Sequence, residues 1–356
     1  MIKKIIVIEI MNILLLTGFA ASSSLVYDVT SEINITENTI LQIPFGDNIL
    51  SIIQQIDKEM VLGYLEDIVS FGPRFTGTES CEQAADYIYN EFESMGMSVR
   101  YHNASDDKWN VINVEATLPG VNVNSNKIYI ICAHYDTDYM SQGADDDGSG
   151  VAAVLASAKV MSQYSFNNTI RFITFGGEEQ FMLGSTRYAK DAKENGDNII
   201  AVLNADMIGS VTWKWWDKET KYIDIWYNDK SAWIANFTYN VSTRFYDHIK
   251  IKVNKAGYKG LSDHASFWNE GFDAIQYKHG GEKPYPDIIE YVNILYNTKV
   301  IKLITASLAA LANDINIPKG DIDESITTNI EPISPSTSIE KIYETFLYNT
   351  INLSPC

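Results

Sequence analysis

The sequence predicts an α/β fold, a three-layer α/β/α sandwich around a mostly parallel, mixed central sheet. Apolar runs alternate with helical patterns along the middle of the chain. The apolar runs are continuous, which is typical of strands that helices cover on both faces. A chain of 356 residues, 46% of them hydrophobic, can form a core of this size.

Five apolar segments are predicted to be strands and four segments to be helices. The strands are VINVEATL (111–118), KIYIICAH (127–134), TIRFITFGG (169–177), NIIAVLNADMIG (198–209) and DAIQY (273–277), and the helices cover about 49–69, 81–95, 149–162 and 182–193. In open α/β sheets, ligand-binding groups gather at the carboxyl ends of the strands. The residues that follow each strand are therefore the first candidates for a functional site.

The N-terminus has the pattern of a secretory signal peptide. Lys3 and Lys4 precede an apolar stretch over about residues 5–16, and the expected cleavage site lies near Ala20. We expect a secreted or extracytoplasmic protein, or a membrane-anchored one if this segment stays uncleaved, although the apolar stretch is short for a span. The predicted organisation is a signal peptide (1–21), a polar spacer (22–48), a catalytic domain (49–316) and a linker with a C-terminal tail (317–356).

Charge and cysteine content exclude two classes of function. The chain carries 46 acidic and 27 basic residues, a formal net charge of -19, and such a surface repels nucleic acid. Its three cysteines do not form a CxxC pair or another metal-binding spacing. The sequence therefore predicts neither a nucleic-acid partner nor a disulfide framework.

His134 and Asp136 stand where the strand over 127–134 ends. An extended chain places residues two apart on the same face, so one side chain can bind a metal while the other orients it. A metal-bound imidazole usually donates its second N–H to a carboxylate. His134 is therefore a candidate ligand with Asp136 as its partner, and a His–Asp pair that only caps a loop is the alternative.

Three consecutive carboxylates, Asp145, Asp146 and Asp147, occur in GADDDGSG before the helix expected over 149–162. Adjacent carboxylates repel one another unless a cation is present. Capping of the helix N-terminus by Asp147 is one alternative, and the alternating ligands of a calcium loop are missing. Since only some of three neighbouring side chains point the same way, we expect one of them to bridge two metal ions.

Further carboxylates follow the next two strands. Glu178 and Glu179 end one strand, and their side chains diverge, so one can bind a metal while the other acts as a general base on water. Asp206 interrupts the apolar segment over 198–209, and a buried carboxylate needs a partner. A surface Glu pair that begins a helix is the alternative for Glu178 and Glu179.

Two histidines in the last part of the catalytic domain compete as ligands. His279 comes just after the strand over 273–277, whereas His264 begins a helix-like segment. The strand-end position favours His279, and a hydrogen-bonded turn is the expected role of His264. Imidazole and carboxylate ligands without thiolate favour zinc. Two zinc ions that share a carboxylate would lie about 3.5–4 Å apart and activate water for hydrolysis.

These residues together resemble the co-catalytic di-zinc exopeptidases, the family of aminopeptidase Y, aminopeptidase S and the bacterial leucyl aminopeptidases. The resemblance covers roughly residues 71–311 and depends on the order and spacing of FGPRFTGT, AHYDT, GADDDGSG, GGEEQFMLGS, NADMIG and AGYKGLSDHASFWNEGFDAI. It implies a secreted zinc aminopeptidase whose substrates are the N-termini of peptides and proteins.

The resemblance also implies a role for each matching residue. The zinc ligands would be His134, Glu179, Asp206 and His279 on single ions, with Asp146 shared between two Zn2+ ions. Glu178 would take a proton from the water that bridges the ions and pass it to the leaving amine. Tyr258 is similar to a tyrosine that stabilises the oxyanion in some members, and Asp287 would orient His279.

The chain departs from the family pattern in two places, and two other functions fit the same fold. An additional residue separates Tyr258 from Ser262, and the segment HGGEKPYPD that begins at His279 is unusual. A glutaminyl cyclase uses one zinc and usually departs from the full ligand set, which is intact here. A non-enzymatic binding domain would have lost ligands, and none is lost.

The substrate preference rests on one aromatic segment. VTWKWWDKETKYIDIWY (211–227) is unusually rich in aromatic residues. It could form the wall of a pocket for an apolar N-terminal residue, or a hairpin that packs over the sheet edge.

Overall fold

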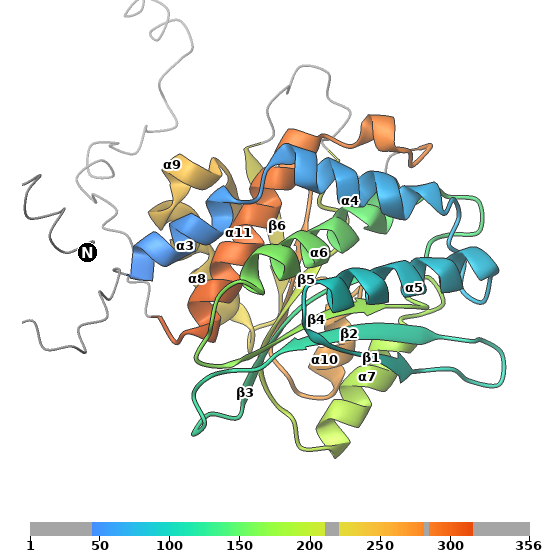
Figure 1. The fold of residues 1–356 in the computed structure, drawn as a ribbon, viewed down its shortest axis with the longest axis horizontal. Coiled ribbons are helices and arrows are strands. Elements are labelled where there is room, and N and C mark those ends of the chain that lie inside the picture. The colour runs from blue at the N-terminus through green and yellow to red at the C-terminus, as the bar shows by residue number, and fades with distance from the viewer. Residues whose placement is uncertain (1–44, 211–220, 281–284, 316–356) are drawn as a thin grey trace, which may run out of the picture. The chain divides into compact units, whose positions relative to one another are not determined.

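The computed structural model describes residues 45–210, 221–280 and 285–315, so the predicted signal peptide and C-terminal tail lie outside the described residues. Within them, an eight-stranded sheet has the strand order β1-β2-β4-β3-β5-β8-β6-β7 (Figure 1). The strands are β1 (Ser98–Asn103), β2 (Ile112–Leu118), β3 (Lys127–His134), β4 (Thr169–Phe175), β5 (Asn198–Ala205), β6 (Tyr222–Tyr227), β7 (Lys252–Gly257) and β8 (Ala274–Lys278).

Helices cover both faces of this sheet, as the predicted three-layer sandwich requires. The helices are α3 (Phe45–Gln54), α4 (Lys58–Ser70), α5 (Glu79–Ser94), α6 (Ser149–Met161), α7 (Leu183–Glu194), α8 (Ala232–Arg244), α9 (Tyr246–Ile249), α10 (His264–Asn269) and α11 (Ile294–Ala312), with short turns η1 (Ala144–Gly148) and η2 (Ile289–Tyr291). Figure 1 shows α4, α6 and α11 on one face and α7 and α10 on the other. The predicted fold class is confirmed.

The core lies between the central strands and these helices. Every residue of β3 after Lys127 is buried, which explains its continuous apolar pattern. The long helix α11 is apolar enough to cross a membrane, but most of its side chains are buried against the rest of the fold. Burial of this kind is typical of a core helix.

The parallel pairing of four strands creates the edge at which the candidate residues meet. β3 pairs in parallel with β4 and β5, and β5 pairs in parallel with β8. Their carboxyl ends, at residues 134, 175, 205 and 278, therefore share one edge. The sheet is nevertheless mixed, because β2 is antiparallel to both of its neighbours and β6 is antiparallel to β8.

The structure contains elements that were not predicted, among them β1, β7, α8 and α11, and it differs from the prediction in two further places. The helix expected over 49–69 is two helices, α3 and α4, because Asp57 begins a new one: its carboxylate accepts the Met60 N–H at 2.8 Å. Residues 222–227 form β6, which lies within the sheet between β8 and β7. These residues therefore belong to the sheet itself, and the rest of the aromatic segment, 211–220, lies outside the described part of the chain.

Candidate metal centre and active site

His134 is the last residue of β3 and is buried. Its Nε2 atom lies 3.1 Å from Asp146 Oδ1 and 4.0 Å from Glu178 Oε2. Its Nδ1 atom lies 3.1 Å from the Asp136 backbone oxygen. Burial alone would lower the pKa of His134, but the surrounding carboxylates, Glu178 first among them, raise it well above its usual value. One ring nitrogen is therefore held in place while the other faces a group of carboxylates.

Asp136 is buried two residues further on and connects three segments of the site. Its Oδ1 atom accepts the Glu178 backbone N–H at 3.1 Å, and its Oδ2 atom accepts that of Glu179 at 3.1 Å. Oδ2 also accepts the Thr76 hydroxyl at 3.1 Å, and Oδ1 lies 3.6 Å from His134 Nδ1. One carboxylate thus orients the imidazole and positions both glutamates.

Asp147 binds the backbone of the turn that connects β3, α6 and β5. Its carboxylate accepts the N–H groups of His134 at 3.2 Å, Gly150 at 2.9 Å and Met207 at 3.2 Å. Three amide donors occupy both of its oxygens. Asp147 therefore holds three segments together, a larger role than the helix cap that the sequence suggested.

Asp145 contacts the second candidate histidine. Its Oδ1 atom accepts the N–H groups of Gly209 and Ser210 at 2.8 and 2.9 Å, and its Oδ2 atom lies 2.7 Å from His279 Nε2. Both His279 and Asp145 are buried. Sequence reasoning had not assigned the carboxylate of Asp145 to His279, because three identical residues in a row do not indicate which one turns toward β8.

Asp287 supports the same turn from a different direction. Its Oδ1 atom accepts the Asp145 N–H at 2.8 Å, and its Oδ2 atom accepts the Asp146 N–H at 3.0 Å. Burial raises the pKa of Asp287 to about 6. The sequence predicts that Asp287 orients His279, whereas these bonds show it holding the backbone of the aspartate turn.

A group of three side chains in this site has metal-binding geometry. His134, Asp147 and Asp206 each offer a ligand atom, and these atoms lie within 4.8 Å of one another. Asp206 is held from β8, where the Gln276 amide donates to its Oδ2 atom at 3.0 Å. Asp146 directs an oxygen at His134 from the same turn as Asp147, so the turn presents two carboxylates to this position.

The electrostatics of this group of carboxylates favour a bound cation. Burial is the largest cause that raises the pKa values of Asp147, Asp206 and Glu178, and neighbouring carboxylates add to it. Burial likewise raises the pKa of Asp263 to about 7. So many buried carboxylates in one place are costly unless cations compensate them. The donors are imidazole nitrogens and carboxylate oxygens without thiolate, a set that fits zinc.

Tyr258 lies in the loop before α10, and His264 is the first residue of that helix. The buried His264 ring places Nε2 2.7 Å from the Lys259 backbone oxygen, and burial lowers the pKa of this ring to about 4. A neutral imidazole that donates to a carbonyl agrees with the predicted turn role. Tyr258 is 73% exposed and stacks on Trp268 with ring centroids 5.4 Å apart.

Arg74 is a structural residue that sequence reasoning missed. Its fully buried guanidinium donates to the backbone oxygens of Tyr135 at 2.7 Å, Gln142 at 2.8 Å and Gly143 at 3.0 Å. These residues begin and end the loop that follows His134. The available signal was the arginine in FGPRFTGT, a segment of small and apolar residues.

Asn113 of β2 holds the loop that carries Glu178 and Glu179. The Asn113 side chain accepts the Gly176 N–H at 3.1 Å and donates to the Gly184 carbonyl at 2.9 Å. Its amide nitrogen also lies 3.0 Å from His102 Nδ1. The amide therefore connects both ends of the glutamate loop.

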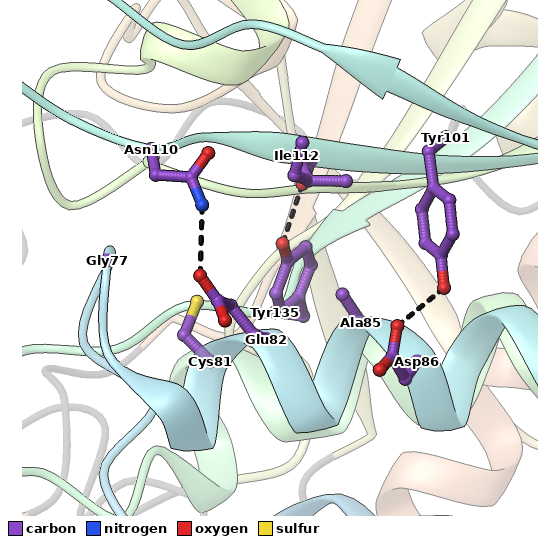
Figure 2. Close-up of a pocket in the computed structure, with 9 residues that line it drawn as sticks. All are labelled: Gly77, Cys81, Glu82, Ala85, Asp86, Tyr101, Asn110, Ile112 and Tyr135. Atoms are coloured by element: carbon purple, nitrogen blue, oxygen red, sulfur yellow. Dashed lines mark hydrogen bonds between the residues drawn. The ribbon is translucent and has the colours of Figure 1, made fainter.

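A cavity of about 370 Å³ lies behind the loop that follows β3. Figure 2 shows Tyr135 in its wall, with the Tyr135 hydroxyl donating to the Ile112 carbonyl at 2.6 Å. Cys81 also lines it, and burial raises the pKa of this thiol to about 12. The thiol is therefore not a nucleophile at neutral pH.

Comparison with known proteins agrees with the arrangement of these residues. The model of peptidase family M28 matches residues 113–293, half of the chain. The chain belongs to peptidase family M28. This membership confirms the resemblance to the zinc exopeptidases and the prediction that the chain is a metallopeptidase.

Individual relatives within this family cover most of the chain. A probable zinc metalloprotease of Pyrenophora tritici-repentis (strain Pt-1C-BFP) is 24% identical over 334 residues, which cover 75% of this chain and 77% of that protein. Leucine aminopeptidase 1 of Paracoccidioides brasiliensis (strain Pb03) is 24% identical over 283 residues, 72% of each chain. The solved aminopeptidase from Aneurinibacillus sp. strain AM-1 is similar with a TM-score of 0.64 and 19% identity, covering 76% of this chain and 98% of that one. The last comparison shows a shared M28 fold.

Proposed function

We propose that this M28 peptidase is a secreted aminopeptidase that removes the N-terminal residue of peptides with two zinc ions. The observation that carries the proposal is the convergence of imidazoles and carboxylates where β3, β4, β5 and β8 end. The relatives described as a leucine aminopeptidase and a zinc metalloprotease support this activity and this metal. The pattern of residues 1–21 supports secretion.

Four of the five proposed zinc ligands lie at or just after the ends of β3, β4, β5 and β8, and the fifth lies in η1. The five are His134, Asp146, Glu179, Asp206 and His279. Asp146 is the proposed shared ligand because its Oδ1 atom faces His134 Nε2 at 3.1 Å, whereas the carboxylate of Asp147, although close enough to bind a metal, also accepts three backbone N–H groups. Bound zinc would supply the Lewis acidity that polarises the scissile carbonyl and makes water a stronger acid.

Glu178 is the proposed general base. Its carboxylate lies among the proposed ligands, 4.0 Å from His134 Nε2, and burial raises its pKa well above the usual range. A raised pKa suits a carboxylate that must hold a proton between two steps. Glu178 accepts a proton from the attacking water and donates it to the amine nitrogen as the C–N bond breaks. The products are a free amino acid and a peptide shortened by one residue.

Tyr258 is the proposed donor to the oxyanion of the tetrahedral intermediate. Its exposed ring stacks on Trp268 in the loop beside the site, which leaves its hydroxyl accessible to a substrate. A hydrogen-bond donor at this position would act only on the charge that develops during the reaction.

A metal analysis combined with an activity assay tests the proposal. The purified protein should contain close to two zinc ions per chain and hydrolyse leucyl-p-nitroanilide, but not its N-acetylated form, because the free amine is required. Chelation should abolish the activity, and added zinc should restore it. A protein with its full metal content that cleaves no free-amine substrate would contradict the aminopeptidase assignment. Cyclisation of an N-terminal glutamine peptide with one bound zinc would instead support a glutaminyl cyclase.

A further inference from the structure

Two lysines and a tryptophan lie beside the metal centre on the face of the sheet that carries α10. The Lys259 ammonium lies 4.4 Å from the centre of the Trp226 ring, and the Lys278 ammonium lies 5.7 Å from it. Trp226 is buried in β6, and Lys278 ends the adjacent strand β8. The two cations therefore come from different segments of the chain and lie near the same aromatic ring.

Lys278 is next to two of the proposed zinc ligands. It directly precedes His279, and its ammonium contacts the sulfur of Met207, the residue that follows Asp206. A substrate whose amine and scissile carbonyl lie at the metal centre would thus place its first side chain within reach of Lys278.

The direct partners of the two ammonium groups decide what else they can bind. Within residues 45–210, 221–280 and 285–315, no carboxylate forms a salt bridge with Lys259 or Lys278. The carboxylate opposite Lys278 in the strand ladder belongs to Asp224, which accepts the Asn254 amide at 2.8 Å. A chain with 46 acidic residues could easily supply a partner at this position. Two neighbouring cations that form no salt bridge with a described carboxylate can bind an anion.

We propose that Lys278 and Lys259 bind the side-chain carboxylate of the substrate's N-terminal residue, so that the preferred substrates are peptides beginning with glutamate or aspartate. The Trp226 ring and Met207 would contact the methylene groups of that side chain. The inference rests on the proposed aminopeptidase function and replaces the apolar preference that the sequence suggests. His264 supports it by holding the backbone of Lys259.

A pair of isosteric substrates tests this inference. Glutamyl- and glutaminyl-p-nitroanilide differ only in the charge of the side chain, so their ratio of kcat/KM isolates the effect of the carboxylate. The wild-type ratio should favour glutamate about tenfold or more, as a charge-assisted hydrogen bond allows. Lys278→Met should bring the ratio to about one, and Lys259→Met should lower it by a smaller factor because Lys259 is more exposed.

The control is Lys255→Met, which removes an exposed lysine of β7 that donates to Asn236 of α8 and does not contact Trp226. Its ratio should equal that of the wild type. Hydrolysis of leucyl and glutaminyl substrates with no preference for glutamate, or an unchanged ratio in Lys278→Met, would overturn this inference and leave the aminopeptidase function standing. Failure to hydrolyse any aminoacyl substrate would instead contradict the function itself.

Discussion

The two sides of the proposed metal centre are built in different ways. On the side of β3 and β4, backbone amides hold the carboxylates: Asp136 accepts two of them and Asp147 accepts three. On the side of β6 and β8, ammonium groups contact an aromatic ring, as Lys278 does at Trp226. Amides are present whatever the neighbouring side chain is, whereas side-chain contacts change with every substitution.

This difference predicts that the rate of cleavage and the preference between substrates can be changed independently. On the two proposals above, we expect changes around Glu178 to affect the cleavage of every substrate and changes around Lys278 to affect which substrate is preferred. A change on the first side should lower the rates for all substrates by the same factor. A change on the second side should alter the ratio between substrates, as Lys278→Met is expected to do.

The largest effect is expected for Glu178→Gln on the first side. Because an amide cannot accept the proton of water, kcat should fall by about a thousandfold for glutamyl and leucyl substrates alike. Zinc content should stay unchanged, since Glu178 is not a proposed ligand. The assays are steady-state kinetics on both substrates and metal analysis of the purified variant.

The matched control is Glu194→Gln, an exposed glutamate at the end of α7 that should leave kcat unchanged. A Glu178→Gln variant that loses activity toward only one substrate would contradict this division between cleavage and substrate preference. It would place part of the specificity on the amide-bound side.

A stability effect is expected for Arg74→Met on the same side. The variant removes a buried guanidinium from five backbone carbonyls, so the free energy of unfolding should fall by about 3 kcal/mol. Urea denaturation monitored by circular dichroism measures this change. Arg187→Met, which removes an exposed arginine from α7, serves as the control and should change stability little. Equal stability of the two variants would show that Arg74 does not hold the loop after β3.

A smaller effect is expected for His264, near the β6 and β8 side, where pH should change the free energy of unfolding. Burial keeps His264 neutral in the folded protein down to a pKa of about 4, whereas it protonates near 6.5 when unfolded. The unfolded state thus binds more protons between these values, and the stability present above pH 6.5 is lost as the pH falls toward 4. Between pH 7 and pH 5 the loss from this residue is about 2 kcal/mol.

The variant His264→Gln should lose correspondingly less stability over this pH range than the wild type does. Urea midpoints at pH 7 and pH 5, at equal free zinc, measure the difference, and the exposed His248→Gln variant should behave like the wild type. The Glu-to-Gln substrate ratio of His264→Gln should also fall, because Lys259 loses its backbone anchor. An unchanged pH dependence would contradict a buried neutral His264.

The central strands and the positions of the candidate ligands could be predicted from the sequence. β3 and β5 are covered on both faces, so their patterns are continuous runs, and the polar residues that follow them stand out. β7 was not predicted, because KVNKAG at the sheet edge buries only Val253. Short edge strands with polar residues have no pattern that separates them from loops.

The contacts between residues could be predicted less well. Asp145, Asp146 and Asp147 have the same side chain, and their separate roles follow from the backbone of their turn and from partners more than a hundred residues away in the case of Asp145. Arg74 likewise contacts carbonyls more than sixty residues along the chain. Long-range bonds to backbone atoms carry no residue pattern, so the sequence shows an unusual residue such as Arg74 but not the carbonyls that it contacts.

Asn113 has a consequence for how the catalytic loop moves. Its side chain joins Gly176 to Gly184, and the Gly184 N–H also donates to the Gly176 carbonyl at 3.1 Å, so the segment with Glu178 and Glu179 is closed at its base. Small local fluctuations cannot open such a loop without breaking several buried bonds at once. The Gly176 amide hydrogen should therefore exchange with solvent as slowly as those of the central strands, and the two glutamates should keep their positions between one substrate and the next.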